Sequence, residues 1–191
     1  LAAFGLMEVY SVSLGQGPSG LVNFHKQLGF VGLGLILFFV FALIDSHSIR
    51  SLKNYLYALA AVLLVLVLAF GSTKNGTKGW FNILGFGIQP VEFVKVVLII
   101  WLSDFFASLA TKVKTSRQFF RSAVSTFFLV LLVLLQPDFG SALILISIWL
   151  ILIAAAGFSW RYFAFIAAAG ILVFGVSWLF LFKDYQKARV M

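Results

Sequence analysis

Four long apolar stretches constrain this chain more than any other feature of its sequence. They occupy residues 28–44, 55–71, 141–157 and 162–182. Each is close to the roughly 20 residues that an α-helix needs to cross about 30 Å of hydrocarbon. Only 10% of the residues are charged, and the mean hydropathy is +1.09, far from the values of soluble domains. The sequence therefore predicts an integral membrane protein.

Three further segments are predicted to cross the membrane, although each departs from a simple span. Segment 1–15 begins inside an apolar run, segment 92–110 carries charges, and segment 122–136 is short. With them the chain is expected to form an all-α, polytopic helical bundle of about seven spans and a single domain over 1–191. Because the first residue lies within an apolar run, we interpret the chain as part of a longer protein.

The net charge of +8 predicts an orientation and a class of partner. Alternate loops share one side of the membrane, so 45–54, 111–121 and 158–161 form one set with seven basic residues against six in the other. The dense run at 111–121 places that set in the cytoplasm by the positive-inside rule, and 72–91 then faces outward. Such charges favour anionic lipid over nucleic acid. The absence of cysteine excludes disulfides and thiolate metal sites.

Segment 74–91 mixes Gly, Asn and Pro with aromatic residues and is too broken for a membrane span. Its sequence is KNGTKGWFNILGFGIQPV. We expect an interfacial re-entrant loop. The alternative is a loop anchored to lipid, with Trp80 in the aromatic belt of the interface.

Two charged residues begin the apolar segment that follows this loop. Glu92 and Lys95 are three residues apart, so on a helix they share a face and are expected to pair. Pro90 suits the first turn of that helix, whose N-terminus favours an anion such as a pyrophosphate. Charges in lipid are costly and indicate a polar substrate cavity, although a purely structural ion pair remains open.

Asp138 is the sharpest candidate for a functional residue. Residues 122–135 supply only about 20 Å of helix, so Gln136, Pro137 and Asp138 are expected below the outer surface. Pro137 ends one helix, and Asp138 could act as the N-cap of the next. An acid at this depth also predicts a water-filled cavity, a cation or a basic partner, for which Lys95 is the candidate.

Five short motifs occur in an order that resembles one protein family. They are GLMEVYS (5–11), NGTKGW (75–80), QPVEFVK (89–95), LLQPDFGSAL (134–143) and DYQKAR (184–189). Together they cover almost the whole chain and resemble the SEDS family of shape, elongation, division and sporulation proteins, which includes RodA, FtsW and SpoVE. Departures from the family pattern at Glu8, Gly79 and Val91 leave the subgroup open.

The resemblance implies a function for the chain. Family members are ten-span peptidoglycan glycosyltransferases of the bacterial inner membrane that polymerise lipid II for cell wall synthesis in elongation or division. They use a divalent cation, Mg or Mn, and pair with a class B penicillin-binding protein transpeptidase. By resemblance, Glu92, Lys95 and Asp138 line the central cavity, with Gln136 beside them, and Trp80 is the loop tryptophan.

The catalytic residue itself is not assigned within this sequence. The resemblance places the catalytic aspartate beyond Met191, so residues 1–191 alone are expected to be inactive. The aspartate would take the proton of the acceptor hydroxyl, and a cation would neutralise the leaving pyrophosphate. Two alternatives stay open: a transporter that flips lipid II, since charges within the membrane also mark translocation pathways, and a noncatalytic membrane scaffold.

Overall fold

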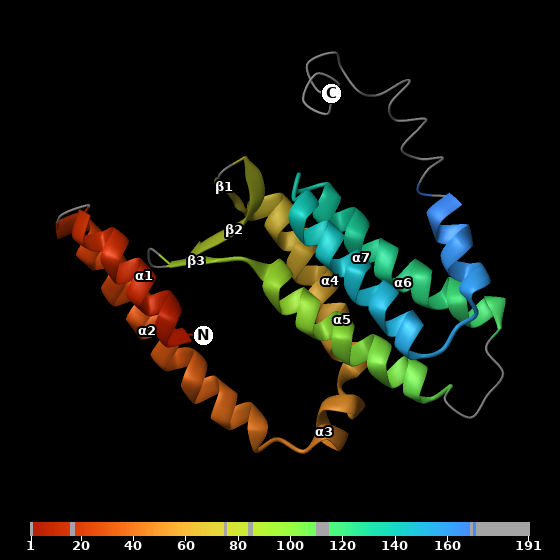
Figure 1. The fold of residues 1–191 in the computed structure, drawn as a ribbon. Helices are drawn as coiled ribbons and strands as arrows, with labels where there is room; N and C mark the ends of the chain where they lie inside the picture. The colour runs from red at the N-terminus through yellow and green to blue at the C-terminus, as the bar shows by residue number, and fades with distance from the viewer. Residues whose placement is uncertain are drawn as a thin grey trace, which may run out of the picture. The chain divides into compact units, whose positions relative to one another are not determined.

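The computed structural model describes residues 2–15, 18–74, 76–83, 86–109, 115–168 and 170. Most of the described residues are helical, and each of the seven predicted membrane segments overlaps a separate helix (Figure 1). The chain divides into two compact units, Leu1–Leu52 and Lys53–Met191, where the sequence predicts a single domain. Three of the described helices contain stretches long and apolar enough to cross a membrane: Phe24–Ala42, Lys53–Phe70 and Ser116–Leu134.

The described residues of the first unit form three helices. Helices α1 (Ala2–Gly15) and α2 (Pro18–Ala42) pack against each other, and the short α3 (Ser46–Ser51) follows. Most of their described side chains are exposed and apolar, as expected for helices that face lipid. Helix α2 begins at Pro18, well before the apolar stretch 28–44, because polarity shows where a helix leaves the hydrocarbon and not where its backbone hydrogen bonding stops.

The second unit is a bundle in which α4 (Lys53–Phe70) packs on α5 (Pro90–Ala107), and α5 on α7 (Phe139–Ala155). Helix α6 (Ser116–Leu134) packs on α7 and touches α4. The bundle interior is mainly apolar. Its largest fully buried side chains include Leu64, Leu98, Leu102, Phe119, Leu129, Leu145, Trp149 and Ile153.

Helix α6 is longer than the sequence predicts. The predicted span covers 122–136, whereas the helix begins at Ser116 and has 19 residues, about 28 Å at 1.5 Å per residue. The Gln118 side chain accepts a hydrogen bond from the Thr115 backbone N–H at 2.8 Å and so starts the helix early. The predicted short helix is therefore wrong, and helix length no longer supports a deep position for Asp138.

A Gly residue ends α7 and turns the chain into the next helix. Gly157 has φ 73°, and its N–H donates to the Ala154 carbonyl at 2.9 Å. The Phe158 N–H donates to the Ile153 carbonyl at 3.3 Å, which completes a Schellman ending. The following helix is described over residues 160–168, so most of the predicted span 162–182 lies outside the described residues.

A small antiparallel sheet replaces the re-entrant loop predicted for 74–91. Strands β1 (Ser72–Lys74), β2 (Thr77–Ile83) and β3 (Phe86–Ile88) lie in the order β1-β2-β3 between α4 and α5. Gly76, with φ 83°, lies in the turn between the first two strands. Pairing between strands satisfies much of the backbone, which a loop at a membrane surface would otherwise leave to water.

Candidate functional site

A cavity of about 380 Å³ lies where the sheet meets the first turns of α5 and α7. Polar residues make up most of its lining. Its lining residues are Lys74, Thr77, Trp80, Gln89, Glu92, Lys95, Asp138, Gly140, Ser141 and Ile144. Two helix N-termini, each with unpaired N–H groups and the positive end of a dipole, therefore share one cavity.

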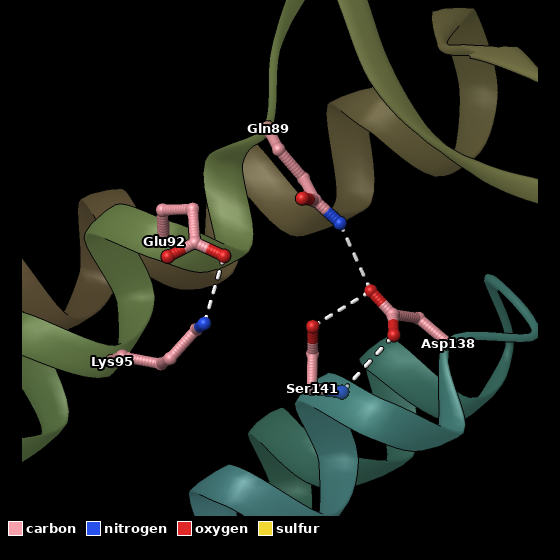
Figure 2. Close-up of polar contacts among 5 residues, drawn as sticks. All are labelled: Gln89, Glu92, Lys95, Asp138 and Ser141. Carbon is pink, nitrogen blue, oxygen red and sulfur yellow. Dashed lines mark hydrogen bonds and ion pairs between the residues drawn. The ribbon is translucent and has the colours of Figure 1, made fainter. Parts of the chain in front are cut away.

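Asp138 is the N-cap of α7, as predicted. Its Oδ1 accepts a hydrogen bond from the Ser141 backbone N–H at 3.0 Å, and its Oδ2 accepts from the Ser141 hydroxyl at 2.8 Å. The Gln89 side-chain amide, at the start of α5, donates to Oδ2 at 3.0 Å (Figure 2). Three donors therefore hold a carboxylate at the cavity wall.

The predicted pairing of Lys95 with Asp138 is wrong. Lys95 Nζ instead donates to Glu92 Oε1 at 2.7 Å, which confirms the predicted pair within α5 (Figure 2). A neighbour one helical turn away is reached by a local rotamer, whereas Asp138 lies on another helix and already has Gln89 as its donor from α5. The Lys95 side chain is 17% exposed and that of Glu92 63%, so Glu92 is the exposed member of the pair.

Trp80 reaches the cavity from strand β2. The Lys74 ammonium lies 5.0 Å from the centroid of its ring, a cation–π contact across the hairpin. A Cβ at Gly87 would lie only 3.2 Å from the ring, so this glycine lets strand β3 approach the indole closely. The lining thus has two cations, Lys74 and Lys95, and two carboxylates.

Gln136, also predicted for the cavity, lies outside its lining. It is 1% exposed, and its side-chain amide reaches the Leu64 carbonyl of α4 at 3.4 Å. Its backbone carbonyl accepts a hydrogen bond from the Lys78 N–H of β2 at 3.2 Å. Gln136 thus joins the end of α6 to α4 and to the sheet, and it supports the cavity from outside.

Several lining residues are absent from the sequence-based prediction although the sequence contains signals for them. Asn75-Gly76 is a strong hairpin signal, and recognising it would have brought Lys74 and Thr77 together with Trp80. Ser141 follows Asp138 by three residues, the spacing at which a cap meets a backbone N–H. Gln89 has only its place before Pro90 as a signal.

Comparison with known proteins gives the family. The sequence model of the FtsW/RodA/SpoVE family, described as cell cycle protein, matches residues 1–191. The chain belongs to this family. The family predicted from the five motifs is therefore confirmed.

Three individual relatives support the FtsW/RodA/SpoVE assignment. The chain is 29% identical to stage V sporulation protein E of Bacillus subtilis, with 100% of this chain and 53% of the relative covered. It is also 29% identical to the peptidoglycan glycosyltransferase MrdB of Escherichia coli, with 96% and 50% covered. A solved structure described as a peptidoglycan synthase complex, coordinating polymerization and crosslinking, matches with a TM-score of 0.81, 29% identity, and 99% and 56% covered.

These matches establish the fold class of this FtsW/RodA/SpoVE-family chain. It is a multi-pass helical membrane protein, as the apolar segments predict. The chain spans about half the length of the curated relatives it matches. The roles of Glu92, Lys95, Asp138, Trp80 and Gln136 stay predictions.

Proposed function

We propose that this chain provides the substrate cavity of a peptidoglycan glycosyltransferase that polymerises lipid II into glycan strands. The observation that carries the proposal is the cavity itself, where two helix N-termini, two cations and two carboxylates surround one opening. Relatives named peptidoglycan glycosyltransferases support it. Such an arrangement suits a lipid-linked pyrophosphate and its sugar, which present negative charge beside hydroxyl groups.

The basic and acidic residues of the cavity would bind different parts of the substrate. Lys95 and the first turn of α5 favour the pyrophosphate, as helix N-termini and ammonium groups favour phosphate elsewhere. Asp138, held by Gln89 and Ser141, is positioned to accept hydrogen bonds from sugar hydroxyl groups. By resemblance to the family, the base that deprotonates the acceptor hydroxyl is an aspartate beyond Met191.

The cavity supplies some, but not all, of the oxygen ligands that a divalent cation, Mg or Mn, would need. Glu92 Oε1 is taken by Lys95, so Oε2 and the Asp138 carboxylate are the oxygens that would hold it. In the described part of the chain no three acidic or histidine side chains cluster, so the substrate pyrophosphate would supply the remaining oxygens. When bound, the cation supplies positive charge to the leaving pyrophosphate.

The proposed activity implies a membrane and a partner. A lipid II polymerase acts at the outer face of the bacterial inner membrane, where the sheet and the cavity lie if the 111–121 segment is cytoplasmic. The structural relative that coordinates polymerization and crosslinking supports a class B penicillin-binding protein transpeptidase as partner.

The test is a polymerisation assay on the protein extended to the length of its relatives. Purified protein, with and without a partner transpeptidase, receives labelled lipid II and Mg²⁺ or Mn²⁺, and products are separated on a gel. Long glycan strands that disappear on chelation support the proposal. Folded protein that makes no strands but moves lipid II across vesicles would identify a flippase. Folded protein that shows neither activity would identify a noncatalytic scaffold.

A further inference from the structure

A second cavity lies at the opposite end of the helix bundle from the sheet. It measures about 780 Å³ and is formed by the start of α4, the end of α5 and the start of α6. Helix α4 starts here and ends at the sheet, and α5 runs back from the sheet to this end (Figure 1). Its lining includes Lys53, Phe105, Thr115, Arg117, Gln118 and Arg121.

The lining of this cavity is strongly basic. Lys53, Arg117 and Arg121 line it, and none of the lining residues that the structure describes is acidic. Asp104 forms an ion pair with Lys53 and so neutralises one of the three cations. No carboxylate among the described residues pairs with Arg117 or Arg121, so the cavity has two guanidinium groups available to an anion.

Further hydrogen-bond donors surround these guanidinium groups. Gln118 accepts the Thr115 N–H through Oε1, which leaves its amide N–H₂ as a donor. The first turn of α6 adds the positive end of its dipole. Because a guanidinium presents a planar fork of N–H groups, this combination suits a phosphate with two free oxygens.

The surroundings of the cavity are apolar and aromatic. The Phe105 ring is stacked on Trp101 at 5.4 Å, and Arg121 lies 5.8 Å from the Phe105 centroid. On α6, three residues beyond Arg121, Val124 is 69% exposed. Aromatic residues gather where a membrane protein meets the lipid headgroups, so a ligand here has both a phosphate region and an apolar region to contact.

We propose that this cavity binds the headgroup of an anionic phospholipid, with its phosphate between Arg117 and Arg121 and its acyl chains along α6. Basic pockets between membrane helices on the cytoplasmic side bind such headgroups. The apolar surface beside the cavity favours a lipid over a soluble phosphate. The basic run at 111–121 predicts that the lipid belongs to the cytoplasmic leaflet.

The test measures lipid retained by the protein at its relatives' length in detergent, using native mass spectrometry. Phosphatidylglycerol is the probe and phosphatidylcholine the neutral comparison. Arg117→Gln with Arg121→Gln is expected to weaken phosphatidylglycerol binding about 5-fold per lost charge, or about 25-fold for the pair. Arg117→Lys with Arg121→Lys keeps both charges and is expected to retain more lipid than the Gln pair.

A matched control removes two charges elsewhere, at the exposed Lys26 and Arg50. Lys26→Gln with Arg50→Gln is expected to leave phosphatidylglycerol binding unchanged. Equal loss in this control, or full retention by the Gln pair, would overturn the proposal. Displacement of the lipid by excess inorganic phosphate would also overturn it, because the cavity would then recognise a free anion. If the Gln pair unfolds, the Lys pair decides: binding no tighter than that of phosphatidylcholine contradicts the site.

Discussion

At the scale of single residues, Asp138 combines two properties that can be separated by experiment. Its side chain caps α7 through Ser141, which is a structural role. It also places a carboxylate in the cavity opposite the start of α5, where Gln89 contacts it. Asn caps a helix about as well as Asp but has no charge, so the two roles respond differently to substitution.

The first prediction uses this difference. In the protein at its relatives' length, Asp138→Asn is expected to leave stability nearly unchanged and to lower polymerisation at least about 10-fold. Asp138→Ala is expected to lose the same activity and, in addition, about 0.5–2 kcal/mol of stability with the cap. Strand synthesis and thermal unfolding in detergent are the measurements. Unchanged polymerisation by Asp138→Asn would show that the residue is only a cap.

The Glu92–Lys95 pair gives a second prediction at the same scale. Glu92 is largely exposed, so the ion pair contributes at most about 1 kcal/mol to stability. Lys95→Gln is therefore expected to unfold at nearly the parent temperature while binding lipid II more weakly. Arg50→Gln, an equal charge loss on an exposed helix outside the cavity, serves as the control. A large loss of stability with unchanged lipid II binding would favour a structural ion pair.

At the scale of elements, the hairpin of β1 and β2 determines which residues reach the cavity. Its turn places Lys74 opposite Thr77, and its longer strand presents Trp80. The end of α6 holds this hairpin through Gln136, whose carbonyl binds the Lys78 N–H. The geometry of the cavity therefore depends on a sheet of only three strands.

A third prediction tests the turn of this hairpin. Gly76 has φ 83°, a conformation that costs an Ala residue about 1–2 kcal/mol. Gly76→Ala is expected to loosen the hairpin, weaken lipid II binding, and increase hydrogen exchange across β1 and β2. Gly34→Ala is the control, because Gly34 lies in α2 and a Cβ there would meet nothing within 4 Å. Identical exchange in both variants would contradict the role of the turn.

At the scale of the whole molecule, the second unit has a polar cavity at each end of its helix bundle. The cavity beside the sheet has balanced charges, whereas the cavity at the other end is basic. If 111–121 faces the cytoplasm, the balanced cavity meets substrate outside and the basic one meets lipid inside. One bundle would thus contact both leaflets through different chemistry.

The fourth prediction concerns the extent of chain that the activity requires. The chain spans about half the length of its curated relatives, and the resemblance places the base beyond Met191. Residues 1–191 alone are expected to bind lipid II weakly and to make no glycan strands, whereas the protein at its relatives' length makes them. Labelled lipid II on a gel compares the two, and strands from residues 1–191 would refute the placement of the base.

Features that depend only on neighbouring residues follow directly from the amino-acid sequence. Apolar runs set the membrane class, and helical spacing set the Glu92–Lys95 pair. The start of a helix just after Pro137 set the capping role of Asp138. Each follows from local geometry, because residues three or four positions apart meet on any helix.

Contacts between residues far apart in the sequence arise from the tertiary packing. Gln89 and Asp138 are 49 positions apart, and no spacing rule predicts that an amide and not Lys95 binds this carboxylate. The burial of Gln136 likewise depends on how α4, α6 and the sheet pack together. Such contacts depend on how whole helices and strands pack together. The hydropathy of the sequence shows which face of a helix is apolar, but it does not specify which other element that face contacts.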